Sequence, residues 1–142
     1  MKSPTKIKAY FMSVDPDSMM PLQGKLRFLD NTLEAKQKYV GGLIQCVSLT
    51  PEIDIICNDE GKLLELPANR AWIDIDEDGN IEVIDLLVGN ILCVRHNGED
   101  FTSIHDEDVE VIRKHLVPVI QTNAGLMPIP ESLMEVDDYD ED

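Results

Sequence analysis

The chain has few basic residues, few aromatic residues and no long apolar segment. Twelve lysines and arginines stand against 28 aspartates and glutamates, so the formal charge at pH 7 is −16. Binding to a nucleic-acid backbone requires basic side chains that displace counterions, and this composition therefore disfavours direct DNA or RNA binding. Lysines interrupt the apolar residues near the N-terminus, and no run approaches the roughly 18 apolar residues of a membrane helix. We expect a cytoplasmic protein without membrane contact.

Motifs of the common catalytic and nucleotide-binding classes are also missing. The sequence contains neither GxxxxGKS/T nor GxGxxG, and it has no GxSxG nucleophile motif. Cys46, Cys57 and Cys93 are widely spaced in apolar runs, which is typical of reduced, buried thiols; a zinc site from these cysteines and His96 is the less favoured alternative. We therefore predict no catalytic residue, no metal and no cofactor. An enzyme that uses scattered carboxylates is the third-ranked hypothesis.

Apolar residues form 43% of the sequence, which is enough to build one hydrophobic core in a chain of this length. Short apolar and β-branched runs between turn residues predict strands at 6–14, 42–49, 53–58, 71–76, 80–87 and 90–96. Helical periodicity predicts helices at 29–40 and 105–116, with Asn31 capping the first and Ser103 or His105 the second. These elements indicate an α+β fold, with a small, mainly antiparallel sheet and two helices.

The composition changes near the end of the second predicted helix. We expect residues 1–117 to form a single α+β domain. Residues 118–130 are expected to form an extended arm whose apolar side chains pack on a second copy of the chain, which makes a homo-oligomer an expectation. Residues 131–142 carry seven acids and no base, and we expect them to form a disordered acidic tail.

Residues 74–85, DIDEDGNIEVID, begin with three alternating aspartates followed by Gly79. This spacing is close to that of an EF-hand calcium loop, which requires a helix on each side. The flanking residues are β-branched and are interrupted by Pro67 and Gly89, so they are poor helix formers. Because Asp-Gly is a strong turn pair, we favour a β-hairpin over a calcium loop for this stretch.

Four segments taken together resemble a known family: YVGGLIQCV at 39–47, CNDEGKLLELPANRAW at 57–72, DLLVGNILCV at 85–94 and TSIHDEDVEVIRKHL at 102–116. They are similar to DUF3846, a domain of unknown function that is common in bacteriophages and in conjugative elements of bacteria. The resemblance covers about residues 30–116. It implies a mobile genetic element as the setting but no activity, and small accessory proteins of phages are more often binders than enzymes.

The first functional hypothesis is a non-enzymatic binding protein that sequesters a small anionic, nucleotide-like ligand and thereby counters a host defence. The Arg70 guanidinium offers donors to an anion, Trp72 offers a stacking surface, and glycine allows the backbone to approach a ligand. A structural role for Arg70, paired with one of the many acids, is the alternative. The predicted ligand-binding residues are Gly41, Gly42, Asn58, Asn69, Arg70 and Trp72.

The alternative hypothesis is an acidic inhibitor that occupies a host protein, with a surface that imitates DNA. The candidate acids are Asp15, Asp17, the 74–78 run, Glu99, Asp100 and the acidic tail. The dipole of the second helix explains the acids at 106–110 equally well, and a charged tail is often only solvated. The expected partners are therefore a small anionic ligand or a host protein, rather than nucleic acid or a membrane.

Overall fold

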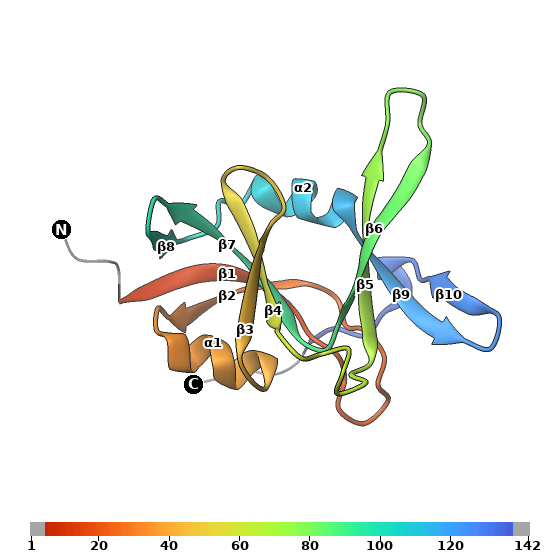
Figure 1. Cartoon of the computed structure of the whole chain (residues 1–142), viewed down its shortest axis with the longest axis horizontal. Coiled ribbons are helices and arrows are strands. Elements are labelled where there is room, and N and C mark those ends of the chain that lie inside the picture. The colour runs from red at the N-terminus through yellow and green to blue at the C-terminus, as the bar shows by residue number, and fades with distance from the viewer. Residues whose placement is uncertain (1–4, 138–142) are drawn as a thin grey trace.

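The computed structural model describes residues 5–137, which form two antiparallel sheets and two α-helices (Figure 1). The first sheet comprises β1 (Lys6–Met12), β2 (Lys25–Asp30), β3 (Ile44–Ser48), β4 (Ile53–Asn58), β7 (Ile91–Asn97) and β8 (Asp100–Thr102). Its strand order is β2-β1-β7-β4-β3, and β8 pairs with β7. The second, in the order β10-β9-β5-β6, comprises β5 (Ala68–Ile75), β6 (Ile81–Val88), β9 (Leu116–Thr122) and β10 (Gly125–Pro128). The helices are α1 (Leu33–Val40) and α2 (Asp108–His115), followed by the 3₁₀ turn η1 (Glu131–Leu133). The predicted α+β fold is confirmed.

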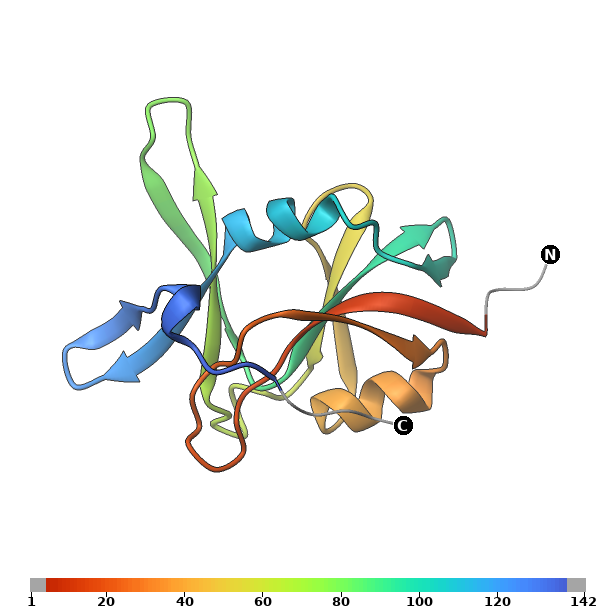
Figure 2. The same ribbon diagram turned by 180° about the vertical axis from the view of Figure 1, so that it is seen from behind.

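The first sheet is buried on both faces, because its central strands alternate apolar side chains between two clusters. On one face, Phe11 and Leu92 belong to a cluster that α1 covers through Val40. On the other face, Tyr10 and Cys93 belong to a cluster completed by side chains of α2 and the second sheet. Figure 2 shows α2 running between the two sheets on this side. The core therefore has two layers, one on each side of β1, β4 and β7.

Both helices begin and end at recognisable signals. Thr32, rather than the predicted Asn31, caps α1 by accepting a hydrogen bond from the backbone N–H of Ala35 at 3.1 Å. Gly41 ends α1 in the left-handed conformation, with φ of 85°. The second helix starts at Asp108, three residues later than predicted, and its first residue has no side-chain cap. Among residues 5–137, neither helix is long and apolar enough to span a membrane.

An ion pair fixes α2 to the first sheet. Arg95 of β7 donates to both carboxylate oxygens of Asp108, at 2.6 and 2.8 Å, in the bidentate arrangement that suits guanidinium and carboxylate. The same carboxylate accepts the backbone N–H of His105 at 2.9 Å. The hydrogen bonds from Arg95 hold the pKa of the largely buried Asp108 carboxyl below its usual value.

The hairpin predicted for residues 74–85 is confirmed. β5 and β6 pair antiparallel up to Ile75 and Ile81, and the turn between them contains Gly79 with a positive φ of 84°. Asp76 orders the turn by accepting from the backbone N–H groups of Asp78 and Asn80, at 2.9 and 2.8 Å. Strands rather than helices flank the acidic run, so it lacks the two helices that hold an EF-hand loop.

The segment after residue 117 differs from the expected extended arm. Residues 118–130 lie mostly in β9 and β10, which form a hairpin, and β9 pairs with β5 through contacts such as Arg70 with Pro118. Part of the expected disordered tail is also ordered: Gln23 Nε2 donates to the carbonyl oxygens of Glu131 and Met134, at 3.2 and 3.0 Å. The remaining tail residues, 138–142, lie outside the described residues.

Candidate functional site

Three of the six predicted ligand-binding residues meet at the C-terminal end of α1. The Asn58 amide, at the end of β4, donates to the carbonyl oxygen of Val40 at 3.1 Å, and its own oxygen accepts the N–H of Glu60 at 2.8 Å. A Cβ atom added to Gly42 would lie only 3.0 Å from Asn58 Nδ2. Gly41, Gly42 and Asn58 are thus brought together, and the asparagine side chain joins the helix end to the sheet.

Asn69 and Arg70 lie apart from these three residues, at the buried start of β5. The Asn69 amide donates to the carbonyl oxygens of Met12 and Gly89, at 2.8 and 2.7 Å. Arg70, only 2% exposed, donates to Asn69 Oδ1 at 2.7 Å and to the carbonyl oxygen of Leu22 at 2.9 Å. This buried polar network joins the second sheet to the first, since its acceptors belong to segments next to β1 and β7.

Two cavities lie elsewhere on the molecule, and none of the six predicted residues lines either of them. Trp72, the sixth, is partly buried against the core cluster of Tyr10 and Ile112. The small cavity, of about 360 Å³, is formed by β1, the segment before β2, α2 and η1. The large cavity, of about 690 Å³, lies over β2 and α1.

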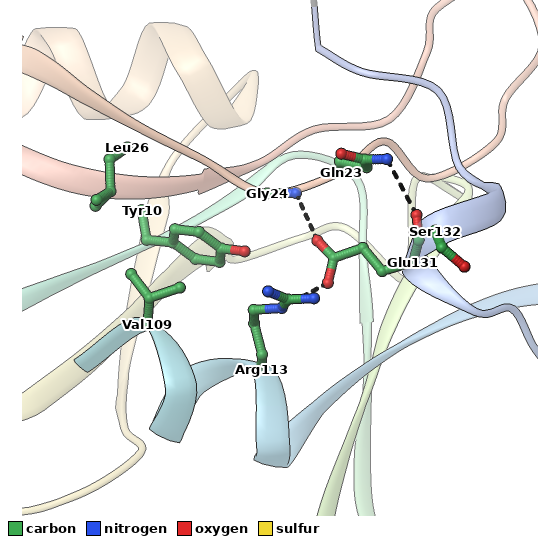
Figure 3. Close-up of a pocket in the computed structure, with 8 residues that line it drawn as sticks. All are labelled: Tyr10, Gln23, Gly24, Leu26, Val109, Arg113, Glu131 and Ser132. Carbon is green, nitrogen blue, oxygen red and sulfur yellow. Dashed lines mark hydrogen bonds and ion pairs between the residues drawn. The ribbon is translucent and has the colours of Figure 1, made fainter. Parts of the chain in front are cut away.

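The small cavity holds a carboxylate of the chain itself (Figure 3). Glu131 Oε1 accepts the backbone N–H of Gly24 at 3.0 Å, and Oε2 lies 2.7 Å from Arg113 Nε of α2. The Glu131 side chain is mostly buried, whereas Arg113 is about half exposed. A backbone N–H and a guanidinium therefore already form a receptor for an oxyanion at this point.

Tyr10 supplies a further polar group to the same cavity. Its side chain is 4% exposed, and Figure 3 shows the phenol oxygen directed towards Gly24, Arg113 and Glu131. Within residues 5–137, the hydroxyl has no hydrogen-bond partner. Gly24 makes room for it, because a Cβ atom at that position would lie 1.9 Å from the Tyr10 oxygen. Although the residue is largely buried, its phenol oxygen is open to the cavity rather than enclosed, so solvent or a ligand can reach it.

Arg70 does not line this cavity, but its charge acts on the Tyr10 and Glu131 side chains that do. Burial, and then the negative charge of Glu131, raises the pKa of Tyr10 to about 12, while Arg70 and Arg113 oppose the shift. Burial lowers the pKa of Arg70, and the charge of Glu131 is the strongest opposing influence. Two guanidinium groups thus act on one carboxylate, and Tyr10 stays a neutral donor at physiological pH.

The large cavity has a balanced charge. Its walls include the bases Lys6, Arg27 and Lys38 and the acids Asp30, Glu34 and Asp137. The Tyr39 hydroxyl in its wall is hydrogen-bonded to Ser13 Oγ at 2.6 Å, so this phenol, in contrast to Tyr10, has a partner. The wall charges therefore favour neither an anionic nor a cationic ligand here.

The cysteines are unpaired, and they differ in exposure. Cys57 and Cys93 are buried as predicted, and burial raises the thiol pKa of both, to about 11 for Cys57. Cys46 is exposed, because β3 is the outer strand of the first sheet. Within residues 5–137, no group of three or more His, Cys, Asp or Glu side chains is arranged to hold a metal ion.

A family model described as "Domain of unknown function (DUF3846)" matches residues 8–117, which is well over half of the chain. The chain belongs to this family. No curated protein and no solved structure matches it. The DUF3846 match includes Tyr10, Gly24 and Arg113 of the small cavity and ends before Glu131. The three donors of the cavity therefore lie within the DUF3846 region, and the carboxylate that they surround lies after it.

Sequence reasoning did not find the residues of the small cavity. Tyr10 is one residue in an apolar strand, the position of Arg113 is explained by the helix dipole, and Glu131 was assigned to the tail. Tyr10 is more than a hundred positions from both Arg113 and Glu131, and no local pattern connects the three residues. They meet only in the folded chain, where the segment 131–137 contacts the residues just before β2 (Figure 3).

Proposed function

We propose that this protein is a non-enzymatic binder that sequesters a small anionic, nucleotide-like ligand in the small cavity. The ligand oxyanion takes the place of the Glu131 carboxylate, between the Gly24 N–H and the Arg113 guanidinium. A volume of about 360 Å³ lies in the usual range for small-molecule pockets, at its lower end. The cavity therefore accommodates the phosphate or carboxylate group of the ligand and the few atoms bonded next to that group.

The observation that carries this proposal is the unpartnered Tyr10 hydroxyl. The Tyr10 side chain is largely buried, but its hydroxyl opens into the cavity and has no hydrogen-bond partner among residues 5–137. A ligand oxygen can replace the water that solvates this hydroxyl, and such a hydrogen bond contributes about 0.5–1.5 kcal/mol net. A hydroxyl in this position can donate to an anion that is larger than the glutamate carboxylate.

The local charge supports an anion in spite of the overall charge of −16. Arg113 and the nearby Arg70 together exceed the single negative charge of Glu131. When Glu131 leaves, the Arg113 guanidinium is free to bind the incoming ligand, and Arg70 acts on that ligand only through its charge, which water screens weakly in a partly buried site. Concentrating two of the few basic residues at one point overcomes repulsion from the remainder of the surface.

Exchange with Glu131 requires only the segment 131–137 to move. This segment is held by hydrogen bonds from Gln23 and Lys25 to its backbone, for example from the Lys25 amine to Asp137 O at 3.2 Å. Movement of the segment also exposes Met134 and Asp137, which are buried in the present structure. In a phage or a conjugative element, such a binder would counter a host defence by withdrawing its nucleotide signal from solution.

Calorimetric titration of the full chain with nucleoside monophosphates, cyclic dinucleotides and inorganic phosphate tests the proposal. Tyr10→Phe removes the hydroxyl without changing the packing, so we expect unchanged or slightly increased stability and roughly 3–10-fold weaker binding. Glu131→Gln removes the competing charge, and we expect binding about 10-fold tighter. Lys114→Gln, on α2 but outside the cavity, is the matched control and leaves the affinity unchanged.

Two results contradict the proposal. One is the absence of heat with every compound in both the wild type and Glu131→Gln. The other is binding that Tyr10→Phe leaves intact while Lys38→Gln, in the large cavity, abolishes it. Arg70→Ala is a poor test, because it also removes the buried hydrogen bonds to Asn69 and Leu22.

A further inference from the structure

The β5–β6 hairpin extends well beyond the two-layered core (Figures 1 and 2). β6 is the outer strand of the second sheet, and among the described residues it pairs with β5 alone. Its far edge carries backbone groups that another strand can use for pairing. An eight-residue edge strand of this kind is long for an unprotected edge.

One face of the hairpin is apolar and remains exposed. Ile73 pairs with Val83 and Ile75 with Ile81, so the four side chains lie on the same face. Ile81 is 64% exposed and Val83 59%, while Ile73 is buried next to Val119. The apolar cluster at the base of the hairpin therefore continues outwards as an uncovered strip along β6.

The other face of the hairpin is acidic at its outer end, and the half-exposed Ile84 lies next to these acids. Asp74 is directly opposite Glu82 in the register, and like charges in this position destabilise a strand pair. Residues 71–94 contain six acids and no base. Lys62 reaches this region from outside, where it pairs with Asp85 near the base of the hairpin. The outer part of the hairpin thus has an uncompensated negative charge beside an exposed apolar strip.

We infer that the edge of β6 is a docking site for an extended protein segment in which apolar and basic residues alternate. Such a segment adds to the sheet as a further strand, with backbone hydrogen bonds along the edge. Side chains of a strand point alternately to its two faces, so its apolar residues cover Ile81 and Val83 and its lysines or arginines lie beside Glu82. The two faces of the hairpin match the two kinds of side chain.

A second copy of this chain fits the site less well. Pairing β6 with another β6 would bring the acids of both hairpins together, between molecules that each carry a charge of −16. A basic partner instead relieves the repulsion between Asp74 and Glu82. The complementary charge therefore identifies the partner as a cationic protein segment.

A fluorescein-labelled ten-residue peptide of alternating valine and lysine is the probe for this site. We expect saturable anisotropy changes with the full-length protein, and protection of the Ile81–Ile84 amides from hydrogen exchange in the complex. Glu82→Lys should weaken binding about five-fold or more, since it replaces attraction by repulsion at an exposed pair. Glu99→Lys, an equal charge change in the turn before β8, is the matched control and should have a much smaller effect.

Strand addition is separated from simple charge attraction by a second peptide. The same sequence with alternate backbone nitrogens methylated keeps every side chain but cannot pair along one edge, and we expect it to bind at least 10-fold more weakly. Equal binding of the methylated peptide, or equal loss from Glu82→Lys and Glu99→Lys, would overturn the inference. So would a dimer of the free protein that protects the Ile81–Ile84 amides without any peptide.

Discussion

β6 and β7 follow one another in the chain but have opposite environments. Six of the eight residues of β6 are apolar, compared with four of the seven in β7. Nevertheless Ile91 to Val94 of β7 are completely buried, whereas the first four residues of β6 are exposed. β7 pairs with β1, β4 and β8, and β6 pairs with β5. Burial here follows from the number of neighbouring strands and not from apolar content.

This difference separates two uses of apolar side chains. In β7 they fill two core layers, where close packing makes each methyl group count. In the first half of β6 the apolar side chains Ile81, Val83 and Ile84 are exposed to solvent, and their truncation should leave the fold intact, whereas Leu87 near the end of β6 belongs to the core. Substitutions in the two strands are therefore the most direct test of which residues maintain the structure and which are available for binding.

The largest difference is expected between Leu92→Ala and Val83→Ala. Leu92, which is 0% exposed, lies in the layer under α1, and its truncation should lower the free energy of unfolding by about 4 kcal/mol. Val83→Ala should change it by less than about 0.5 kcal/mol. Urea unfolding followed by circular dichroism measures both. Comparable losses in the two variants would show that β6 is covered in solution.

A smaller loss of stability is expected from breaking the ion pair that joins β7 to α2. Asp108→Ala leaves the Arg95 guanidinium without its carboxylate partner, and should cost about 2 kcal/mol near neutral pH. Asp106→Ala, which removes a mainly exposed bridge to Lys8, is the control and should cost less than about 0.5 kcal/mol.

The ion pair between Arg95 and Asp108 makes the free energy of unfolding depend on pH. The pKa of Asp108 is lower in the folded state than in the unfolded chain, mainly because of the hydrogen bonds from Arg95. Its contribution is therefore fully present above a pH of about 4 and is lost as the pH falls through the depressed pKa. Urea midpoints of the wild type and Asp108→Ala should converge in acid; a constant difference down to the lowest pH would contradict this.

The smallest effect is expected from Glu82→Lys, and its sign is opposite. The substitution converts the like-charged pair with Asp74 into an attractive one, and should stabilise the free protein by about 0.3 kcal/mol. The gain should shrink as salt is added, because both groups are exposed. Thermal melts at low and high ionic strength measure it. A loss of stability would mean that Glu82 has a favourable partner in solution.

Local patterns are sufficient to predict both helices and two of the hairpins, β3–β4 and β5–β6. The β3–β4 hairpin at 44–58 and the turn at Gly79 follow from β-branched residues on either side of turn residues. The end of α1 at Gly41 follows from the glycine pair after Val40. The division into two sheets was not predictable, since it depends on pairings such as β1 with β7 and β5 with β9 between distant segments.

The strand β2 and the hairpin of β9 and β10 had no clear signal. In β2, KLRFLD, Phe28 is exposed and only Leu29 is buried, so the two faces are not distinguished by polarity. In β9, Pro118 follows the second predicted helix and is a poor strand former, yet it lies in the strand opposite Arg70. The small cavity depends on both regions, because Gly24 precedes β2 and Glu131 follows β10. A site formed by the least patterned segments could not be predicted from the sequence.

The position of β1 between β2 and β7 also matters while the protein is being made. β1 and β2 are close in sequence and can pair early, but β7 is synthesised roughly eighty residues after β1. At ordinary translation rates this delay is on the order of ten seconds. For that time the inner edge of β1 is open on the ribosome, with Phe11 and Met12 uncovered. The nascent chain is thus open to mispairing at a strand whose last four residues are buried in the finished fold.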